Sequence, residues 1–260
     1  MQIATALEKY LVSSNTHEPS SKERRFYLSD MGKCPRVRWL KRHGVDTEFE
    51  PFVNWIFKMG DLIHDFGYKA LESQGLLISA EETVETEHFV GRYDGMIKGA
   101  DGKKKLFDFK SAGSYKMKKI LAGEDDEENI SQILSYVMFE KEKGDKDLSD
   151  TGSIIYINKE PNDQVPIVFF EKEYHLTDWR AKQIKEEMDK MIKYWEDDEI
   201  PRCSCPSWMK PYNSYQPLCQ ANDKDIRKYL SMVEEGKKLV STKKILYLVD
   251  GEKRKELVTL

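Results

Sequence analysis

The feature that most constrains the fold is an alternation of apolar and charged residues between positions 106 and 110, Leu-Phe-Asp-Phe-Lys. Side chains two residues apart on a β-strand point to the same face. The pattern therefore predicts a strand with Asp108 and Lys110 on one face and with Phe107 and Phe109 on the other. A half-buried strand with a weak ion pair on its solvent face is the simplest interpretation.

A second strand precedes this one across a glycine-rich turn. Residues 91–110 contain Gly-Arg-Tyr-Asp-Gly, then Gly-Ala-Asp-Gly, then the strand of Asp108, which predicts a hairpin centred near Asp101. That register places Asp94 opposite Asp108, and such partners stand about 5 Å apart at Cβ. Two carboxylates this close repel each other unless a cation lies between them. With Lys110 beside them, they form a candidate Mg²⁺ or Mn²⁺ site that activates a water molecule.

A long helix is predicted over residues 52–74, from apolar residues at helical spacing. His64 lies off the apolar stripe, and Gly60 and Gly67 lie one turn before and one turn after it, on its own side. Each glycine costs a helix about 1 kcal/mol relative to alanine, which indicates that another group must approach His64 closely. A neutral imidazole there is a candidate metal ligand. An ordinary surface histidine is the alternative.

A further helix is predicted over residues 126–142, with Gln132 and Tyr136 four residues apart on one face. The two side chains suit a nucleotide phosphate or base, through hydrogen bonding and stacking. An ordinary polar patch is the alternative.

Charge is unevenly distributed along the 260 residues, although the net charge is only −4. Basic residues gather in segments 22–42 and 103–119, which favours a phosphate-binding groove on an otherwise acidic body. Solvated helix faces are the alternative interpretation. Four basic residues of these segments are candidate phosphate contacts: Arg36, Arg38, Lys116 and Lys118.

The order of the predicted elements indicates the fold class. Helices are predicted at 2–12, 29–43, 52–74, 126–142, 177–198 and 223–239, before and after a block of strands. This order favours an α/β domain with a mixed sheet flanked by helices. A hairpin about Asp250-Gly251 is predicted near the end.

The predicted location is the cytoplasm, or the host cytoplasm for a viral protein, without a membrane partner. No apolar run approaches the roughly 20 residues of a membrane span. The first residues lack a basic stretch followed by an apolar core.

Four cysteines are present: Cys34, Cys203, Cys205 and Cys219. Disulfides are rare in cytosolic proteins, and four thiols are the number required by one 4Fe–4S cluster or one structural Zn²⁺. Unmodified thiols are the third possibility.

Several short motifs in this order resemble the PD-(D/E)XK nuclease superfamily, and more narrowly the RecB-like exonucleases with an iron–sulfur cluster, including the CRISPR-associated group. The matching pieces span residues 29 to about 220. They are SDMGKCPRVRWL, GDLIHDFG, GRYDG, FDFKS and QILSY, followed by the late cysteines.

The resemblance implies a restriction-endonuclease-like mixed sheet and a metal-dependent exonuclease acting on single-stranded DNA ends, in recombination, repair, phage DNA metabolism or CRISPR adaptation. It also implies the role of each matching residue. Lys110 would orient or deprotonate the attacking water, and Gln132 and Tyr136 would position the DNA. The implied metal ligands are His64, Asp94, Asp108 and the backbone carbonyl of Phe109.

A 4Fe–4S cluster on the four cysteines is also implied, joining the amino-terminal helix region to the carboxy-terminal segment. The spacing departs from the usual pattern, because this chain has C-x-C and then thirteen residues before Cys219. The expected nuclease domain is 1–220, including Cys34 and the 203–219 segment. Residues 221–260 are expected to form an extension that binds a partner protein or covers the DNA channel.

Two other functions fit the same sequence. One is a DNA-binding scaffold with weak catalysis, stabilised by a structural metal cluster. The other is a metal-stabilised interaction module in which the cysteines are the main feature.

Overall fold

The computed structural model describes residues 6, 10, 24–207, 209, 212–234 and 237–260. The helix predicted over residues 2–12 falls almost entirely outside these residues. The chain forms two compact units. The first, here called the sheet unit, comprises Tyr27–Gly32 and Lys58–Asp189; the second, the cysteine unit, comprises Met1–Phe26, Lys33–Phe57 and Lys190–Leu260.

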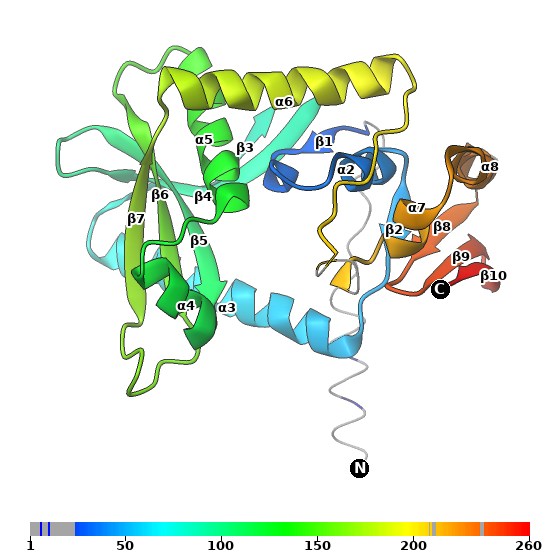
Figure 1. Cartoon of the computed structure of the whole chain (residues 1–260). Helices are drawn as coiled ribbons and strands as arrows, with labels where there is room; N and C mark the ends of the chain where they lie inside the picture. The colour runs from blue at the N-terminus through cyan, green and yellow to red at the C-terminus, as the bar shows by residue number, and fades with distance from the viewer. Residues whose placement is uncertain (1–5, 7–9, 11–23, 208, 210–211, 235–236) are drawn as a thin grey trace. The chain divides into compact units, whose positions relative to one another are not determined.

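The sheet unit is built on a six-stranded mixed sheet (Figure 1). Its strands are β1 (Phe26–Tyr27), β3 (Leu77–Glu85), β4 (Phe89–Lys98), β5 (Lys104–Ala112), β6 (Leu148–Asn158) and β7 (Phe169–His175). The order is β1-β4-β5-β6-β7, with β3 also paired to β4. Strands β5 and β6 run parallel, whereas the β4–β5 and β6–β7 pairs are antiparallel. This confirms the predicted mixed sheet.

Helices cover both faces of this sheet. Helix α3 (Pro51–Ser73) packs Ile63, Tyr68 and Leu71 against the buried pair Phe107 and Phe109. Helix α5 (Glu127–Glu142) packs against β6 on the opposite face, where Gly152 leaves room for the side chain of Ile133. The unit also contains a 3₁₀ turn (Leu28–Asp30), α4 (Ser114–Leu121) and the first part of α6 (Asp178–Glu196). The alternation seen in the sequence thus places the phenylalanines under α3 and Asp108 under α5.

Helix starts follow the capping residues in the sequence. The Asp126 carboxylate accepts a hydrogen bond from the Asn129 N–H and begins α5, and the Thr177 hydroxyl accepts one from the Arg180 N–H and begins α6. Both helices therefore match their predicted ranges closely.

The helix predicted over 29–43 is shorter than expected. Helix α2 spans only Pro35–Arg42. Gly32 adopts a φ of +77°, which interrupts any helix begun at Ser29, and Pro35 restarts it because proline suits a first helical turn.

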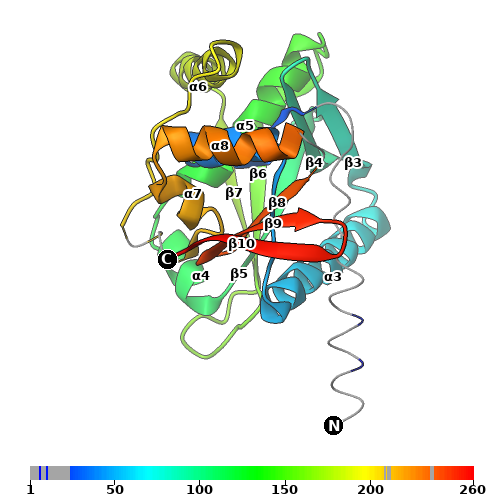
Figure 2. The ribbon, with the colours of Figure 1, turned by 90° about the vertical axis from the view of Figure 1, so that its right-hand side faces the viewer.

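The cysteine unit contains a four-stranded sheet in the order β10-β9-β8-β2, of which β8, β9 and β10 are labelled in Figure 2. Its strands are β2 (Val45–Thr47), β8 (Lys238–Ser241), β9 (Ile245–Asp250) and β10 (Lys253–Thr259). Its helices are α2, α7 (Gln216–Gln220) and α8 (Asp223–Glu234). Lys253 pairs with Asp250, which confirms the predicted hairpin.

Three strands within residues 221–260, namely β8, β9 and β10, belong to this unit's sheet. The helix predicted over 223–239 ends at Glu234, and strand β8 follows and pairs in parallel with β2. Strands β8, β9 and β10 therefore form one sheet with β2. No helix of the described residues is long and apolar enough to cross a membrane.

Candidate functional site

The hairpin of β4 and β5 positions the two candidate carboxylates. Gly95 pairs with Phe107, so the next step of the register sets Asp94 opposite Asp108, as predicted. The ladder ends at this step, and the Phe109 N–H donates to Asp94 Oδ2 at 2.6 Å instead of to a strand carbonyl. Because a buried N–H needs an acceptor, this bond fixes the Asp94 carboxylate beside β5.

Asp108 is the centre of a buried polar cluster. The Asp108 residue is 3% exposed, and its Oδ2 lies 2.5 Å from Lys110 Nζ. Gln132 Nε2, from α5, lies 3.4 Å from Asp108 Oδ1 and 3.3 Å from the Tyr136 hydroxyl oxygen. The structure thus brings together four predicted site residues, two from β5 and two from α5.

The two α5 residues are buried, so neither side chain is accessible for direct contact with DNA. Tyr136 is 0% exposed and Gln132 is 7% exposed. The Tyr136 ring fills the space over Gly91, where a Cβ atom would lie 2.6 Å from the ring. This burial favours a role in which Tyr136 and Gln132 orient Asp108.

His64 reaches the same cluster from α3. Its Nδ1 lies 3.6 Å from Asp94 Oδ1. One turn further along the helix, a Cβ atom at Gly67 would overlap the Phe109 ring, whereas Gly60 has open space around it. Gly67 therefore permits the close approach of the Phe109 ring to α3, on the side of the helix where the sequence indicated a close contact. Gly60 has no such role.

Burial and charge shift the protonation of these groups. Burial raises the pKa of Asp94 to about 7, and the Asp108 charge adds to the effect. Burial lowers the pKa of His64 against the opposing influence of Asp108. Burial also acts to lower the pKa of Lys110, but the charges of Asp108 and Asp94 outweigh it and raise that pKa. The site therefore combines a neutral imidazole with a charged ammonium.

The donor set fits a hard divalent cation by its chemistry. Carboxylate and carbonyl oxygens from Asp94, Asp108 and Phe109, with the His64 imidazole, are ligands suited to Mg²⁺ or Mn²⁺. In the part of the chain that the structure describes, these side chains do not gather as closely as the four cysteines do. Lys110 instead neutralises Asp108. A divalent cation at Asp108 would therefore compete with the ammonium group of Lys110.

Glu81 is a third carboxylate that sequence reasoning missed. In the β3–β4 register, Ala80 pairs with Gly95 and Glu82 pairs with Tyr93. Glu81 therefore lies opposite Asp94. Its φ of +54° is a left-handed backbone conformation that non-glycine residues rarely adopt. No local pattern in the sequence signals this conformation, because it arises from the pairing of β3 with β4.

We expect Asp94→Asn to stabilise the protein against unfolding when divalent ions are absent. The raised pKa means that the folded state holds a proton which the unfolded chain releases near pH 4, so stability falls as pH rises from about 4 to about 7. Asparagine cannot ionise, yet its amide oxygen still accepts from the Phe109 N–H. At pH 8 the variant should be more stable by on the order of 3 kcal/mol, and near pH 4 the difference should vanish. Urea unfolding at both pH values measures this, and equal stability at pH 8 would contradict it.

The candidate phosphate contacts differ in exposure. Lys116 and Lys118 lie exposed on α4, where Lys116 pairs with Asp126 at 2.7 Å. Arg36 and Arg38 are only 8% and 2% exposed. Their burial favours a structural role for both arginines over contact with nucleic acid.

The four cysteines converge within the cysteine unit, as predicted. Their sulfur atoms all lie within 4.8 Å of one another. Cys34 immediately precedes α2, Cys219 lies on α7, and Cys203 and Cys205 lie on the segment between α6 and α7. The cluster therefore joins an amino-terminal helix to two carboxy-terminal segments and is suited to bind a metal ion or a cluster.

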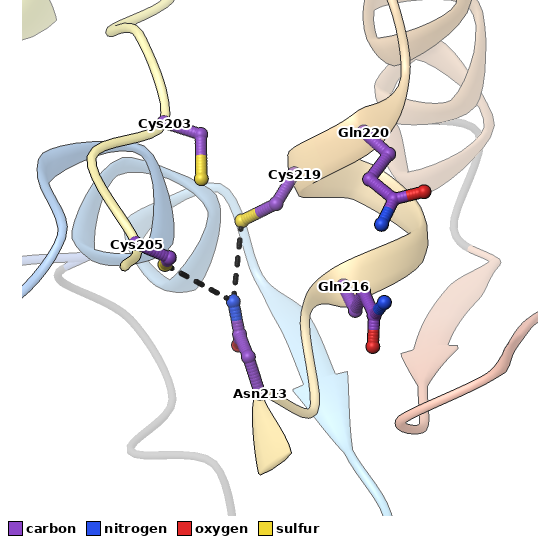
Figure 3. A pocket seen from close by; sticks show the side chains of 6 residues that line it. All are labelled: Cys203, Cys205, Asn213, Gln216, Cys219 and Gln220. Carbon is purple, nitrogen blue, oxygen red and sulfur yellow. Dashed lines mark hydrogen bonds between the residues drawn. The ribbon is translucent and has the colours of Figure 1, made fainter. Parts of the chain in front are cut away.

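Burial and contacts among the thiols shift their pKa values in opposite directions: burial raises the pKa of Cys205, and a hydrogen bond with Cys34 raises that of Cys219. The pKa of Cys34 is lowered to about 4, mainly by a hydrogen bond with Cys219 and further by backbone N–H groups of Val37 and Ser204. Asn213, which sequence reasoning missed, places its side-chain nitrogen 3.3 Å from Cys205 Sγ and 3.4 Å from Cys219 Sγ (Figure 3). Its amide donates to both sulfur atoms and so orients these two thiols.

Comparisons with known proteins give similarity at the level of structure alone. No family model and no curated protein matches the sequence. The chain resembles the crystal structure of SSO0001, with a TM-score of 0.51 and 19% identity, over 85% of this chain and 96% of that chain. It is less similar to the alkaline exonuclease LHK-Exo from Laribacter hongkongensis (TM-score 0.46, 11% identity, 74% of this chain and 94% of that chain). A phage related exonuclease from Haemophilus somnus 129PT follows (TM-score 0.35, 16% identity, 53% and 69%). The similarity to SSO0001 shows that the two chains share a fold.

Proposed function

We propose that this chain is a divalent-metal-dependent deoxyribonuclease that hydrolyses phosphodiester bonds at single-stranded DNA ends. The observation that supports it most is the convergence of Asp94, Asp108 and Lys110 at the end of the β4–β5 ladder. The motif set that resembles the PD-(D/E)XK nucleases contains these same residues. A carboxylate pair buried beside a lysine is costly to retain without a function, because like charges in a buried site repel.

Each residue of the site has a distinct part in the proposed reaction. His64, Asp94, Asp108 and the Phe109 carbonyl would hold the divalent ion, which when bound neutralises phosphate charge and lowers the pKa of a bound water. Lys110, released from Asp108, would orient the attacking water by donating a hydrogen bond to it and would stabilise the charge that develops on the phosphate. Tyr136 and Gln132 hold Asp108 in place.

The DNA strand would approach along α4, which begins directly after β5. This helix exposes Tyr115 together with Lys116 and Lys118. An aromatic face among ammonium groups suits a single strand, because bases stack on the ring while lysines neutralise the phosphates.

Digestion of linear single-stranded DNA with Mg²⁺ or Mn²⁺ tests the proposal. We expect the wild type to release nucleotides from DNA ends only with a divalent ion. Lys110→Ala should lower the rate by about 100-fold, the lower range for loss of one electrostatic stabiliser. Circular single-stranded DNA of the same sequence serves as the control, since an exonuclease needs an end and leaves it intact. Equal digestion by Lys110→Ala and the wild type would remove this site from the mechanism, and absence of any digestion would favour the DNA-binding scaffold.

The cysteine site has a structural part in this proposal. By joining α2 to the segments that carry Cys203, Cys205 and Cys219, it would hold the two ends of the cysteine unit together. Four thiols suffice either for the 4Fe–4S cluster that the resemblance implies or for a single Zn²⁺.

A further inference from the structure

Tyr68 of α3 has a buried hydroxyl oxygen with no hydrogen-bond partner among the residues that the structure describes. Its ring packs edge-on against the Phe109 ring, with centroids 5.7 Å apart, and against the His64 imidazole, with centroids 6.3 Å apart. Tyr68 therefore lies beside the candidate metal ligands, one helical turn after His64. Burying a hydroxyl without a hydrogen bond costs stability, so this group calls for an acceptor that the described residues do not supply.

The Tyr68 hydroxyl lies within reach of charged groups of the site. Burial raises the pKa of Tyr68, the negative charges of Asp94 and Glu81 add to this effect, and the positive charge of Arg92 opposes it. The hydroxyl is therefore close enough to these side chains to respond to their charges, and it remains protonated at neutral pH. A protonated phenol can donate a hydrogen bond to an anion and carries no negative charge that would repel one.

Arg92 brings a positive charge to the same place. It lies two residues before Asp94 on β4 and pairs with Thr83 of β3. Its Nη1 lies 3.4 Å from Glu81 Oε2, and both side chains of this ion pair are largely exposed. An exposed ion pair contributes little to stability, so the guanidinium can leave Glu81 for a stronger acceptor at small cost. A phosphate group is such an acceptor, because a guanidinium can bind it through two parallel hydrogen bonds.

Tyr93 of the same sheet shows the contrast with a tyrosine whose hydroxyl is satisfied inside the protein. It follows Arg92 on β4 and is 0% exposed. Its hydroxyl donates to Glu82 Oε2 at 2.9 Å, so its burial leaves no donor unused. Tyr68 lacks such an internal acceptor among the described residues. The difference indicates that the Tyr68 hydroxyl is available to a bound molecule.

We propose that Tyr68 and Arg92 bind a backbone phosphate of the single-stranded DNA at the carboxylate site. The Tyr68 hydroxyl donates to a non-bridging oxygen of this phosphate, and the Arg92 guanidinium turns from Glu81 to the same group. One neutral and one charged donor would then hold the strand beside Asp94, where carboxylates alone would repel it. The inference rests on the proposed nuclease function, because it assigns two further contacts to the substrate of that function.

Binding of a fluorescently labelled decathymidylate tests this inference. The titrations use Ca²⁺ in place of Mg²⁺, and electrophoresis afterwards checks that the DNA is intact. Tyr68→Phe removes only the hydroxyl and should weaken binding by about 10- to 100-fold, the range for a hydrogen bond to a charged group. Arg92→Gln should weaken binding by about 10-fold and lower the slope of log affinity against log salt by about 0.7, the value for one phosphate of a single strand. Arg92→Lys keeps the charge and should keep that slope.

Urea unfolding without DNA or divalent ions gives an independent measurement. Tyr68→Phe should raise the urea midpoint by about 0.3 M, because it removes a buried hydroxyl that makes no hydrogen bond. Tyr93→Phe is the matched control, since it removes a hydroxyl that donates to Glu82. It should lower the midpoint and leave DNA binding within about twofold of the wild type. A role of Tyr68 in packing alone would not make Tyr68→Phe both more stable and weaker in DNA binding.

The outcomes separate this inference from the nuclease proposal. Equal binding by Tyr68→Phe and the wild type, or a lower urea midpoint for Tyr68→Phe, would overturn the inference, and so would failure of the wild type to bind the decathymidylate. Weaker binding by Tyr68→Phe and Arg92→Gln would support it even if the wild type hydrolyses no DNA with Mg²⁺ or Mn²⁺. Hydrolysis at the full wild-type rate by both variants would leave the nuclease proposal in place and remove this phosphate contact from it.

Discussion

Replacing Asp108 with asparagine is expected to lower the rate of single-stranded DNA hydrolysis by about 1,000-fold, as large an effect as loss of one electrostatic stabiliser produces. The carboxylate is buried and carries the negative charge that attracts either Lys110 or a divalent ion. Asparagine keeps the shape and can still meet Gln132, but it loses that charge. Initial rates at saturating Mn²⁺, together with Mn²⁺ affinity by calorimetry, separate lost binding from lost chemistry.

A matched control lies at the opposite end of the same strand. Lys104 of β5 pairs with Asp145 at 2.8 Å, which is also an aspartate–lysine ion pair but a more exposed one. Asp145→Asn should therefore leave the rate within about twofold of the wild type, because a surface pair contributes little. If both variants lose activity equally, general damage to the sheet is the cause and the site assignment fails.

Gly67→Ala is expected to destabilise the protein by about 2 kcal/mol and to lower nuclease activity as well. The added methyl group would overlap the Phe109 ring, so α3 must move away from β5 or the ring must leave its place in the core. Overfilling a packed core costs about 1–3 kcal/mol, which exceeds the helical gain of alanine over glycine. Because His64 lies one turn earlier on α3, the same displacement would move its imidazole from Asp94.

The same helix provides the control for this substitution. Gly60 gains the same helical preference from alanine but has nothing within 4 Å of the new Cβ. Gly60→Ala should therefore stabilise the protein by up to about 1 kcal/mol. Urea midpoints of both variants give the comparison. A stable and fully active Gly67→Ala would show that the close packing of α3 on Phe109 is not needed to position His64.

The parts of the structure that the sequence predicts well depend on neighbouring residues. The β4–β5 register follows from the alternation around Asp108 and the glycine turn, and it sets Asp94 opposite Asp108. The starts of α5 and α6 follow from the capping side chains of Asp126 and Thr177. These features need only short-range information, because turn and cap residues act within a few positions of themselves.

The parts that could not be predicted depend on residues far apart in the chain. Arg36 lies in a basic segment that suggests an exposed surface, yet its acceptors are supplied by residues 201–223. Tyr136 has the spacing of a surface residue, but packing over Gly91 buries it. Strands β8 and β2 pair although they lie almost 200 positions apart in the sequence. Neither strand has a sequence pattern that identifies its partner. Such contacts form only when the fold brings the segments together, so the sequence of each segment alone does not predict them.

The division of the chain has a consequence for its synthesis on the ribosome. The sheet unit is almost wholly contained in the continuous stretch Lys58–Asp189, whereas the cysteine unit needs Lys33–Phe57 and Lys190–Leu260 together. Domains generally fold as they emerge, the amino-terminal ones first. The proposed nuclease centre would then assemble on the nascent polypeptide before the segment that carries Cys203, Cys205 and Cys219 has been synthesised. Metal binding by the four cysteines would accordingly follow assembly of the proposed nuclease centre, and a chain truncated before Cys203 would keep the candidate catalytic residues but lack three of the four thiols.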